Sequence, residues 1–383
     1  MFSYVCVSLC KFSVEASIPF TKNDLQYTIS EKEFFSIGGR MAKLTIIDIA
    51  KIAGVSPSTV SLVMNKRPGI SVGTRQRVMD VVERMNFAPS QSARSQILKS
   101  TQNIAVLFNM NSHPLEHLFQ ESLNKNILRY CTEREFNLVF VACSFEDDSS
   151  PVTLPNILRS RGVDGVISYG YVPVSVITAL QDLELPYLLL DSHQLPNHCM
   201  SLHVDYYMAS RLAMHHLMAN GHTQIAYIGS NFPPLYSQQT FEGYRSVLDE
   251  SGIDVPLGWI QMQSRDSDDE DSATKQMQAI LQSGKLPTAV FCAADIYAIG
   301  AMRAIKQAGL RVPEDISIIG IDDILISSYI DPPLTTVRID THRLAKQGCD
   351  ILFESIRIDE VLTAHEDFQE FSIVERETVI SLK

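Results

Sequence analysis

The sequence predicts two folds in one chain: a small all-α module near the N-terminus, followed by an α/β core of two parallel sheets. Helical patterns with strong capping signals fill residues 45–85. From Gln102 onward, short apolar runs alternate with amphipathic stretches, which is typical of parallel strands buried on both faces. At 383 residues the chain is long enough for two or three domains.

We expect residues 1–42 to take no part in the fold. The opening segment MFSYVCVSLCKFSVEAS lacks the basic start of a secretory signal, and Lys11 interrupts its apolar stretch. The segment is either an unstructured extension or the product of a start site assigned too far upstream. In the second case Met41 is the natural start, and Gly38-Gly39 encodes a ribosome-binding sequence read in frame.

Three short helices are predicted between Thr45 and Met85. Thr45 and Asp48 form a capping-box pattern at the start of the first helix, and Gly54 is expected to end it. Ser56 caps the second helix, with Pro57 at its first position, where a missing N–H costs nothing. Ser71 caps a third helix that runs to about Met85. The inward residues are expected to be Ile46, Ile49, Ala50, Ala53, Val60, Val63, Met64, Val78, Val81, Val82 and Met85.

Charge is distributed unevenly along the chain. Residues 41–100 hold nine Lys and Arg against three acids, a net charge of +6, and residues 1–40 are neutral. The whole chain carries −12, so the part after Ser100 carries −18. A basic module therefore precedes an acidic body, and only the module has the charge that DNA binding requires.

The second helix is short and rich in hydroxyl groups, as a helix lying in a DNA groove needs to be. The string TIIDIAKIAGVSPSTVSLVMN, followed by ISVGTRQRVMDVVERMNFAPSQSARS, resembles the DNA-binding domain of the lac repressor family of transcription regulators. A small helical bundle with a merely polar surface is the plainer interpretation, and this resemblance argues against it. It implies a helix-turn-helix domain over residues 43–89.

The resemblance implies a role for each matching position. Pro57, Ser58 and Leu62 hold the positions that contact bases. Leu62 departs from the Arg or His often found there, and an apolar side chain is expected to touch a thymine methyl group rather than guanine. The other expected contacts, to DNA backbone or adjacent bases, are Thr45, Ser56, Thr59, Ser61, Asn65 and Arg75.

Residues 90–101 match the family's hinge helix, which folds on the operator and pushes a Leu into the minor groove. In this sequence Gln96 follows Ser95, and Ile97 and Leu98 are displaced by one and two positions. Either the hinge helix is rotated so that Ile97 enters the groove, or the DNA kink is weaker. The expected hinge contacts are Ala93, Arg94, Gln96 and Ile97.

The stretches VDYYMASRLAMHHLMANGHTQIAYIGS and AVFCAADIYAIGAMRAIKQAGLRVPEDISIIGIDD look like the effector-binding core of the same family, which is similar to periplasmic sugar-binding proteins. The resemblance implies a core over residues 102–383 in which the chain crosses three times between two subdomains. The first is expected at about 102–222 and 340–365, and the second at about 223–339 and 366–383. A small molecule would bind in the cleft between them.

Several effector positions depart from the family pattern. Asp322 matches the hydroxyl-binding Asp, but Thr240 replaces an Arg that often clamps the ligand, and Ala294 replaces an Asn. Loss of the Arg argues against an acidic ligand, and loss of aromatic residues argues against a purine. A neutral sugar is the expected effector, and a different effector or none is the alternative. The candidate effector residues are Asp322, Thr240, Ala294, Leu115, Glu116 and Asp205.

Other function classes find little support. The chain has no Walker A, GxSxG or GxGxxG string, so an enzyme is disfavoured, and we expect no metal or cofactor. The seven Cys are scattered, which favours reduced thiols in the cytoplasm, and no apolar run reaches membrane-spanning length. A secreted sugar-binding protein would have no use for the basic module.

The sequence thus predicts a cytoplasmic transcription regulator, a repressor of carbohydrate-uptake or catabolic genes. It would bind a near-palindromic double-stranded operator as a homodimer, under the control of a small-molecule effector. Two copies are expected because one short helix reads too few base pairs to be selective.

Overall fold

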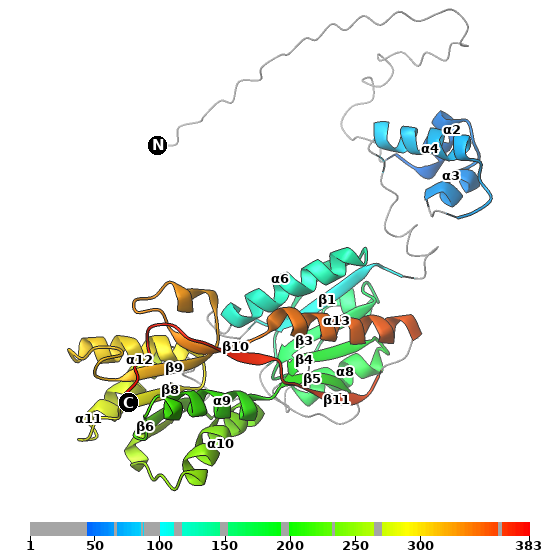
Figure 1. Ribbon diagram of the computed structural model, residues 1–383. Coiled ribbons are helices and arrows are strands. Elements are labelled where there is room, and N and C mark those ends of the chain that lie inside the picture. Colours follow the sequence, from blue (N-terminus) through cyan, green and yellow to red (C-terminus); the bar gives the residue numbers. More distant parts are fainter. Residues whose placement is uncertain are drawn as a thin grey trace, which may run out of the picture. The chain divides into compact units, whose positions relative to one another are not determined.

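The computed structural model describes residues 44–64, 67–85, 87, 100–110, 117–145, 152–192, 199–231, 234–263, 270–358 and 362–383 (Figure 1). Its contacts divide the chain into two compact units, Met1–Pro89 and Ser90–Lys383. The predicted fold class, a helical module and an α/β core with two sheets, is confirmed.

The first unit contains three helices: α2 (Ile46–Ala53), α3 (Pro57–Met64) and α4 (Val72–Arg84). The predicted caps are confirmed. The Thr45 hydroxyl accepts a hydrogen bond from the Asp48 amide at 3.3 Å, and the Asp48 carboxylate accepts one from the Thr45 amide at 2.9 Å. Gly54 ends α2 in the left-handed conformation, with a φ of 65°, which glycine adopts without strain.

The core of the first unit comes from one face of each helix. Ile49 and Ala53 of α2, Val60 of α3 and Val78 of α4 are buried together, and Phe87 closes the cluster after α4. The buried positions in α3 are Val60 and Val63, so the rest of this helix lies toward the surface. The amphipathic pattern thus decides which face of α3 is presented to solvent.

The first sheet of the second unit has six strands in the order β11-β5-β4-β3-β1-β2, all parallel. Helices α6 (His117–Glu133) and α13 (Thr341–Ile358) cover one face, and α7 (Asn156–Arg159) and α8 (Val174–Asp182) cover the other. The strands are β1 (Asn103–Asn109), β2 (Asn137–Cys143), β3 (Gly165–Gly170), β4 (Tyr187–Ser192), β5 (Met200–Val204) and β11 (Ala364–Phe368).

The second sheet follows the same plan, in the order β12-β10-β9-β8-β6-β7, with only the pair β10 and β12 antiparallel. Its strands are β6 (Ile225–Ser230), β7 (Ile260–Gln263), β8 (Ala289–Cys292), β9 (Ser317–Asp322), β10 (Thr335–Ile339) and β12 (Phe371–Val374). Its longer helices are α9 (Tyr206–Ala219), α10 (Pro234–Glu250), α11 (Glu270–Gln282) and α12 (Asp295–Gln307), and two short 3₁₀ helices are η2 (Leu257–Trp259) and η4 (Leu325–Ser328). Figure 1 shows the pairs α9–α10 and α11–α12 on its two faces.

The first crossing between the sheets lies earlier than the sequence predicts. Helix α9 packs against α10 and against strands of the second sheet, so the chain crosses at Val204–Tyr206 and not after residue 222. His222 belongs to the second sheet as well, because its ring nitrogens bond Thr288 Oγ1 and the Ile380 carbonyl oxygen at 3.0 Å each. The helix end at Gly221 gave a sequence signal, but it does not coincide with the crossing.

The three crossings are hydrogen-bonded to one another. The Asp205 amide donates to the Phe368 carbonyl oxygen at 3.0 Å, and the Asp340 amide donates to the Glu370 carbonyl oxygen at 3.0 Å. The third crossing therefore lies between the other two, after β11 ends at Phe368 and before β12 starts at Phe371. It comes three residues later than the predicted boundary at 365.

Candidate functional site

The N-terminal end of α3 gathers three hydroxyl groups. Ser56 Oγ accepts a hydrogen bond from the Thr59 amide at 3.1 Å and lies 2.8 Å from Ser58 Oγ and 2.9 Å from Thr59 Oγ1. A helix N-terminus carries partial positive charge, so this cluster has the polarity to meet phosphate oxygens.

The outward face of α3 continues from this cluster. Pro57 and Ser58 are exposed, and Leu62, one turn beyond Ser58, leaves 40% of its surface exposed. The three predicted base-contacting residues therefore lie on the solvent side of one short helix. Asn65 lies outside the described residues, as do Ala93, Arg94, Gln96 and Ile97 in the predicted hinge.

Two predicted phosphate contacts have structural tasks in this conformation. Arg75 donates from Nη1 to the Val63 carbonyl oxygen at 3.3 Å and from Nη2 to the Arg67 carbonyl oxygen at 2.7 Å, so it caps the C-terminal end of α3. Thr45 uses its hydroxyl in the capping box, where it donates to Asp48 Oδ2 at 2.6 Å. All three bonds tie an element of the module in place.

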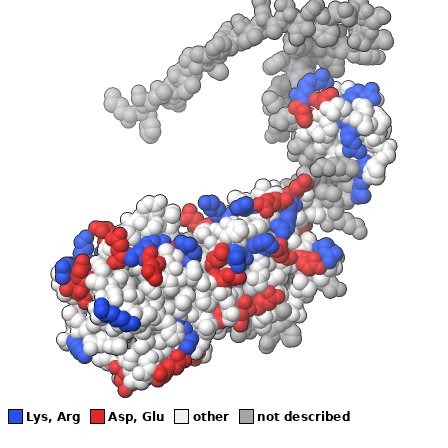
Figure 2. Space-filling view, viewed as in Figure 1, with Lys and Arg blue, Asp and Glu red and all other residues white. Residues whose placement is uncertain are grey.

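Lys and Arg side chains gather on the first unit, whereas the visible face of the second unit mixes both signs (Figure 2). The described part of the first unit holds five basic side chains, Lys51, Arg67, Arg75, Arg77 and Arg84, against Asp48, Asp80 and Glu83. The charge asymmetry counted in the sequence therefore extends to this surface, and it favours contact with a polyanion.

A second group of polar residues lies where strands of both sheets end. Asp191 is the penultimate residue of β4 in the first sheet, and Asp322 ends β9 of the second. Tyr206 donates to Asp191 Oδ1 at 3.1 Å, and its ring meets the Tyr236 ring edge-on at 4.7 Å between centroids. We call Asp191, Tyr206, Tyr236 and Asp322 the strand-end site. Ligands of parallel sheets gather at the carboxyl ends of the strands.

Electrostatics link the two halves of the strand-end site. Burial raises the pKa of Asp322 well above its ordinary value, and the nearby carboxylates of Asp295 and Asp191 raise it further. Burial also raises the pKa of Tyr206, with smaller contributions from Asp191 and Asp322. An acid of the first sheet thus raises the pKa of an acid of the second sheet, which links the two sheets within one site.

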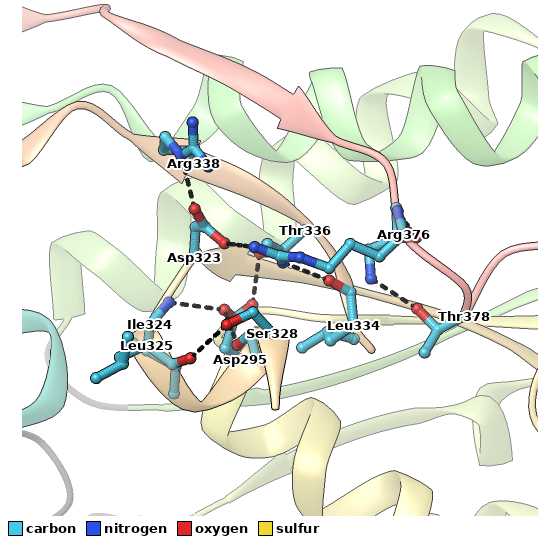
Figure 3. A network of polar contacts seen from close by, with 12 residues as sticks. Asp295, Asp323, Ile324, Leu325, Ser328, Leu334, Thr336, Arg338, Arg376 and Thr378 are labelled. Atoms are coloured by element: carbon cyan, nitrogen blue, oxygen red, sulfur yellow. Dashed lines mark hydrogen bonds and ion pairs between the residues drawn. The ribbon is translucent and has the colours of Figure 1, made fainter. Parts of the chain in front are cut away.

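Asp295 is the buried polar centre behind this site (Figure 3). It begins α12, and its carboxylate accepts from the Ile324 amide at 3.1 Å, Ser327 Oγ at 2.6 Å and Thr336 Oγ1 at 2.5 Å. Burial raises the pKa of Asp295 to about 7, against the lowering effect of these three bonds. Gly320 leaves it room, because a Cβ there would lie 2.2 Å from Asp295 Oδ1.

Asp323 has a different environment from its neighbour Asp322. Its carboxylate pairs with Arg338 Nε at 2.6 Å and with Arg376 Nη2 at 2.5 Å (Figure 3). Arg376 also donates to the Leu334 carbonyl oxygen at 2.7 Å. The two acids of the GIDD string are thus separated in role: Asp323 holds strands together, while Asp322 stays in the strand-end site.

The other predicted effector residues are placed differently from expectation. Thr240 is fully buried, with its hydroxyl bonded to Tyr227 and to the Tyr236 carbonyl oxygen, so it reaches no ligand in this conformation. Asp205 caps α9 through the Met208 amide at 3.0 Å and accepts from Gln369 at 2.8 Å. Ala294 is buried at the start of α12, and Leu115 and Glu116 lie outside the described residues. Sequence reasoning missed Asp191 and Tyr206, although an acid ending the strand YLLLD was a usable signal.

The described residues contain no group of three or more His, Cys, Asp or Glu placed to hold a metal ion. In the same part of the chain, no single helix is long and apolar enough to cross a membrane, and only α2 and α3, bent by 101° at their junction, reach that length and composition together.

Comparisons with known proteins identify the family to which both units belong. The family model described as "Bacterial regulatory proteins, lacI family" matches residues 45–90, and a "Periplasmic binding protein-like domain" matches residues 214–379. A relative from Aliivibrio salmonicida, the HTH-type transcriptional repressor PurR, is 34% identical over 82% of this chain and 92% of its own length. The chain belongs to the lacI family. It is accordingly a DNA-binding transcriptional regulator with an effector-binding type of core.

Further relatives extend the match over most of the chain. The PurR repressor of Vibrio cholerae is 31% identical over 88% of this chain and 98% of its own length. The solved structure of the lac repressor dimer bound to operator and the anti-inducer ONPF is 26% identical, with a TM-score of 0.73, over 88% of this chain and 100% of that one. A CelR–cellobiose complex shares the fold at a TM-score of 0.61 and 22% identity, covering 88% of this chain and 99% of that one.

Arg75→Met is expected to loosen the C-terminal end of α3, because two carbonyl groups lose a charged donor worth about 1–3 kcal/mol. Hydrogen exchange of the full chain should show faster exchange of α3 amides. Arg77→Met, at an exposed position of α4, the helix that also carries Arg75, is the matched control and should leave the α3 amides unchanged. Equal exchange in both variants would contradict the capping role.

Asp295→Asn should flatten the pH dependence of stability. The pKa of Asp295 is raised on folding, so its stabilising contribution is complete below pH 4 and is lost as pH rises through about 7. The loss is on the order of 4 kcal/mol. Thermal melts from pH 4 to 8 should show a slope for the unmodified chain that the variant lacks. Asp315→Asn, at an exposed acid of the same subdomain, should keep the slope, and a slope retained in Asp295→Asn would count against this assignment.

Proposed function

We propose that this chain is a repressor that binds a near-palindromic operator as a homodimer. Its affinity for the operator falls or rises when a small molecule occupies the strand-end site. The observation that carries this proposal is the exposed face of α3, which presents hydroxyl groups and Leu62 on a basic module. The named repressors among its relatives, and the lac repressor dimer bound to operator, support it.

Base reading is assigned to Pro57, Ser58 and Leu62, which the fold leaves on the outer face of α3. The hydroxyl groups of Ser56 and Thr59 at the start of α3 are assigned to contacts with DNA phosphate. Ser61, in the next turn of the helix, is assigned to the same kind of contact. Thr45 and Arg75 would meet phosphate from positions fixed by their structural bonds. Asn65, directly after α3, keeps the role implied by the sequence, and so do Ala93, Arg94, Gln96 and Ile97 in the connecting segment.

Exposed apolar side chains of η4 and the residue after it support a homodimer. Leu325 is 74% exposed, Ile326 43% and Tyr329 78%, within five consecutive positions. Such a cluster on a surface is typical of a subunit interface, and a second copy of this chain is the occupant we assign to it. Two recognition helices in one dimer would read both halves of an operator.

A neutral sugar is the effector we assign to the strand-end site. Asp191 and Asp322 accept hydrogen bonds from hydroxyl groups, and no Arg stands at position 240 to attract an anion. The target would then be genes of carbohydrate uptake or breakdown. The rings of Tyr206 and Tyr236 also fit a ligand with an apolar face, so a nucleobase belongs in the test panel.

Selection of duplexes from a randomised pool tests the operator proposal. The unmodified chain should enrich a near-palindromic sequence, and Leu62→Arg should change the preferred base at one symmetric position per half-site towards guanine. Val72→Arg is the matched control, since Val72 is an 85% exposed apolar residue of α4. That variant should bind more tightly at low salt without a new base preference. No enrichment by the unmodified chain would refute the function.

Fluorescence anisotropy with the selected duplex tests the effector. A neutral sugar should change operator affinity, and Asp322→Asn should shift the required concentration at least tenfold, because one acceptor of the strand-end site becomes a donor. Glu314→Gln, at an exposed acid of the same subdomain, should respond like the unmodified chain. A response to nucleobases alone would replace the sugar in this proposal, and no response to either class would remove the effector.

A further inference from the structure

One carboxylate binds the segment at which the chain enters the core. Asp164 accepts four hydrogen bonds from three consecutive residues: from Ser100 Oγ at 2.5 Å, the Thr101 amide at 2.7 Å, Thr101 Oγ1 at 2.8 Å and the Gln102 amide at 2.8 Å. We call Ser100, Thr101, Gln102 and Asp164 the entry clamp. Two of the four donors are backbone amides, so the clamp fixes the course of the main chain.

A second layer of bonds holds the clamp against the sheet. The Asp164 amide donates to the Asn103 carbonyl oxygen at 2.8 Å, and Asn103 Nδ2 donates to the Gly162 carbonyl oxygen at 2.9 Å. On the other side, the Asn137 amide donates to the Gln102 carbonyl oxygen at 2.8 Å. Gln102 has a φ of 54°, a conformation that costs a non-glycine residue energy and that these bonds compensate.

The position of the entry clamp in the first sheet indicates its function. It lies at the amino ends of β1 and β3, which pair side by side from Ile104 and Gly165 (Figure 1). The strand-end site lies at the carboxyl ends of β4 and β9, so the two are at opposite ends of the strands. The clamp also holds the residues that lead into β1, so the segment that joins the helical unit to the core is attached to the first sheet at the clamp.

We propose that Asp164 is a positioning residue for operator binding: it holds the start of the core chain so that a dimer presents its two helical units at one spacing. The inference rests on the proposed function. Without the clamp, three more residues per subunit would have to be ordered when both half-sites are occupied. The conformational entropy lost in ordering them would lower the affinity for the operator. Contact with a single half-site needs no such ordering.

The test compares two duplexes: the palindrome selected by the unmodified full-length chain, and the same duplex with one half-site scrambled. Asp164→Ala should weaken binding to the palindrome at least tenfold and binding to the single half-site by less than twofold. It should also lose the preference for the selected spacing over duplexes with one or two inserted base pairs. Asp182→Ala, which removes an exposed acid of the same subdomain, controls for the change in net charge.

A milder variant keeps the proposal testable if Asp164→Ala does not fold. Ser100→Ala combined with Thr101→Val removes two hydroxyl donors and keeps both backbone amide bonds, so it should give an intermediate loss on the palindrome alone. This double variant decides the case if Asp164→Ala does not fold. Equal binding by the clamp variants and Asp182→Ala overturns the proposal, and so does an equal loss on both duplexes. If the unmodified chain selects no duplex, the proposed function itself fails.

Discussion

The core depends on three crossings that are bonded into one junction. A chain that passes between two parallel sheets only once would leave them free to separate, but here the third crossing is held on both sides. Gln369 donates to Asp205 at 2.8 Å, and Arg343 pairs with Glu370 at 2.6 Å, beside the two backbone bonds of the same junction. The two sheets are therefore tied together where the chain passes between them, which is the arrangement that a hinge between two subdomains requires.

Four acids near the junction show how environment sets the role of a carboxylate. Asp295 is satisfied by three donors and shapes the loop after β9, and Asp323 is neutralised by two Arg side chains. Asp191 and Asp322 come from different sheets, and the Asp191 carboxylate adds to the burial and the Asp295 charge that raise the pKa of Asp322. Only this last pair gains from a hydrogen-bond donor placed between the sheets. The internal pairing of the others keeps their charge from competing for the same ligand.

Local signals in the sequence predicted local structure well, and distant partners limited the rest. The capping box at Thr45, the end of α2 at Gly54 and the strand pattern of both sheets depend on residues a few positions apart, and all agree with the structure. The resemblance places Thr240 and Asp205 at effector positions, but the side chains of both are bonded within the fold. Asp205 bonds Gln369, 164 positions later, and no periodicity reports such a contact. The crossing at Val204 was missed for the same reason.

The first sheet offers a rigid path between the two ends of the core. Strand β1 has seven residues and spans about 23 Å, and its packing on both faces leaves little room for internal deformation. A ligand that draws Asp191 and Asp322 together would turn the first sheet as a body, and the entry clamp at its far end would move with it. A loosely attached chain would absorb that movement. Four bonds to one carboxylate would instead transmit it, so the role proposed for Asp164 in operator affinity would extend to the regulation of that affinity.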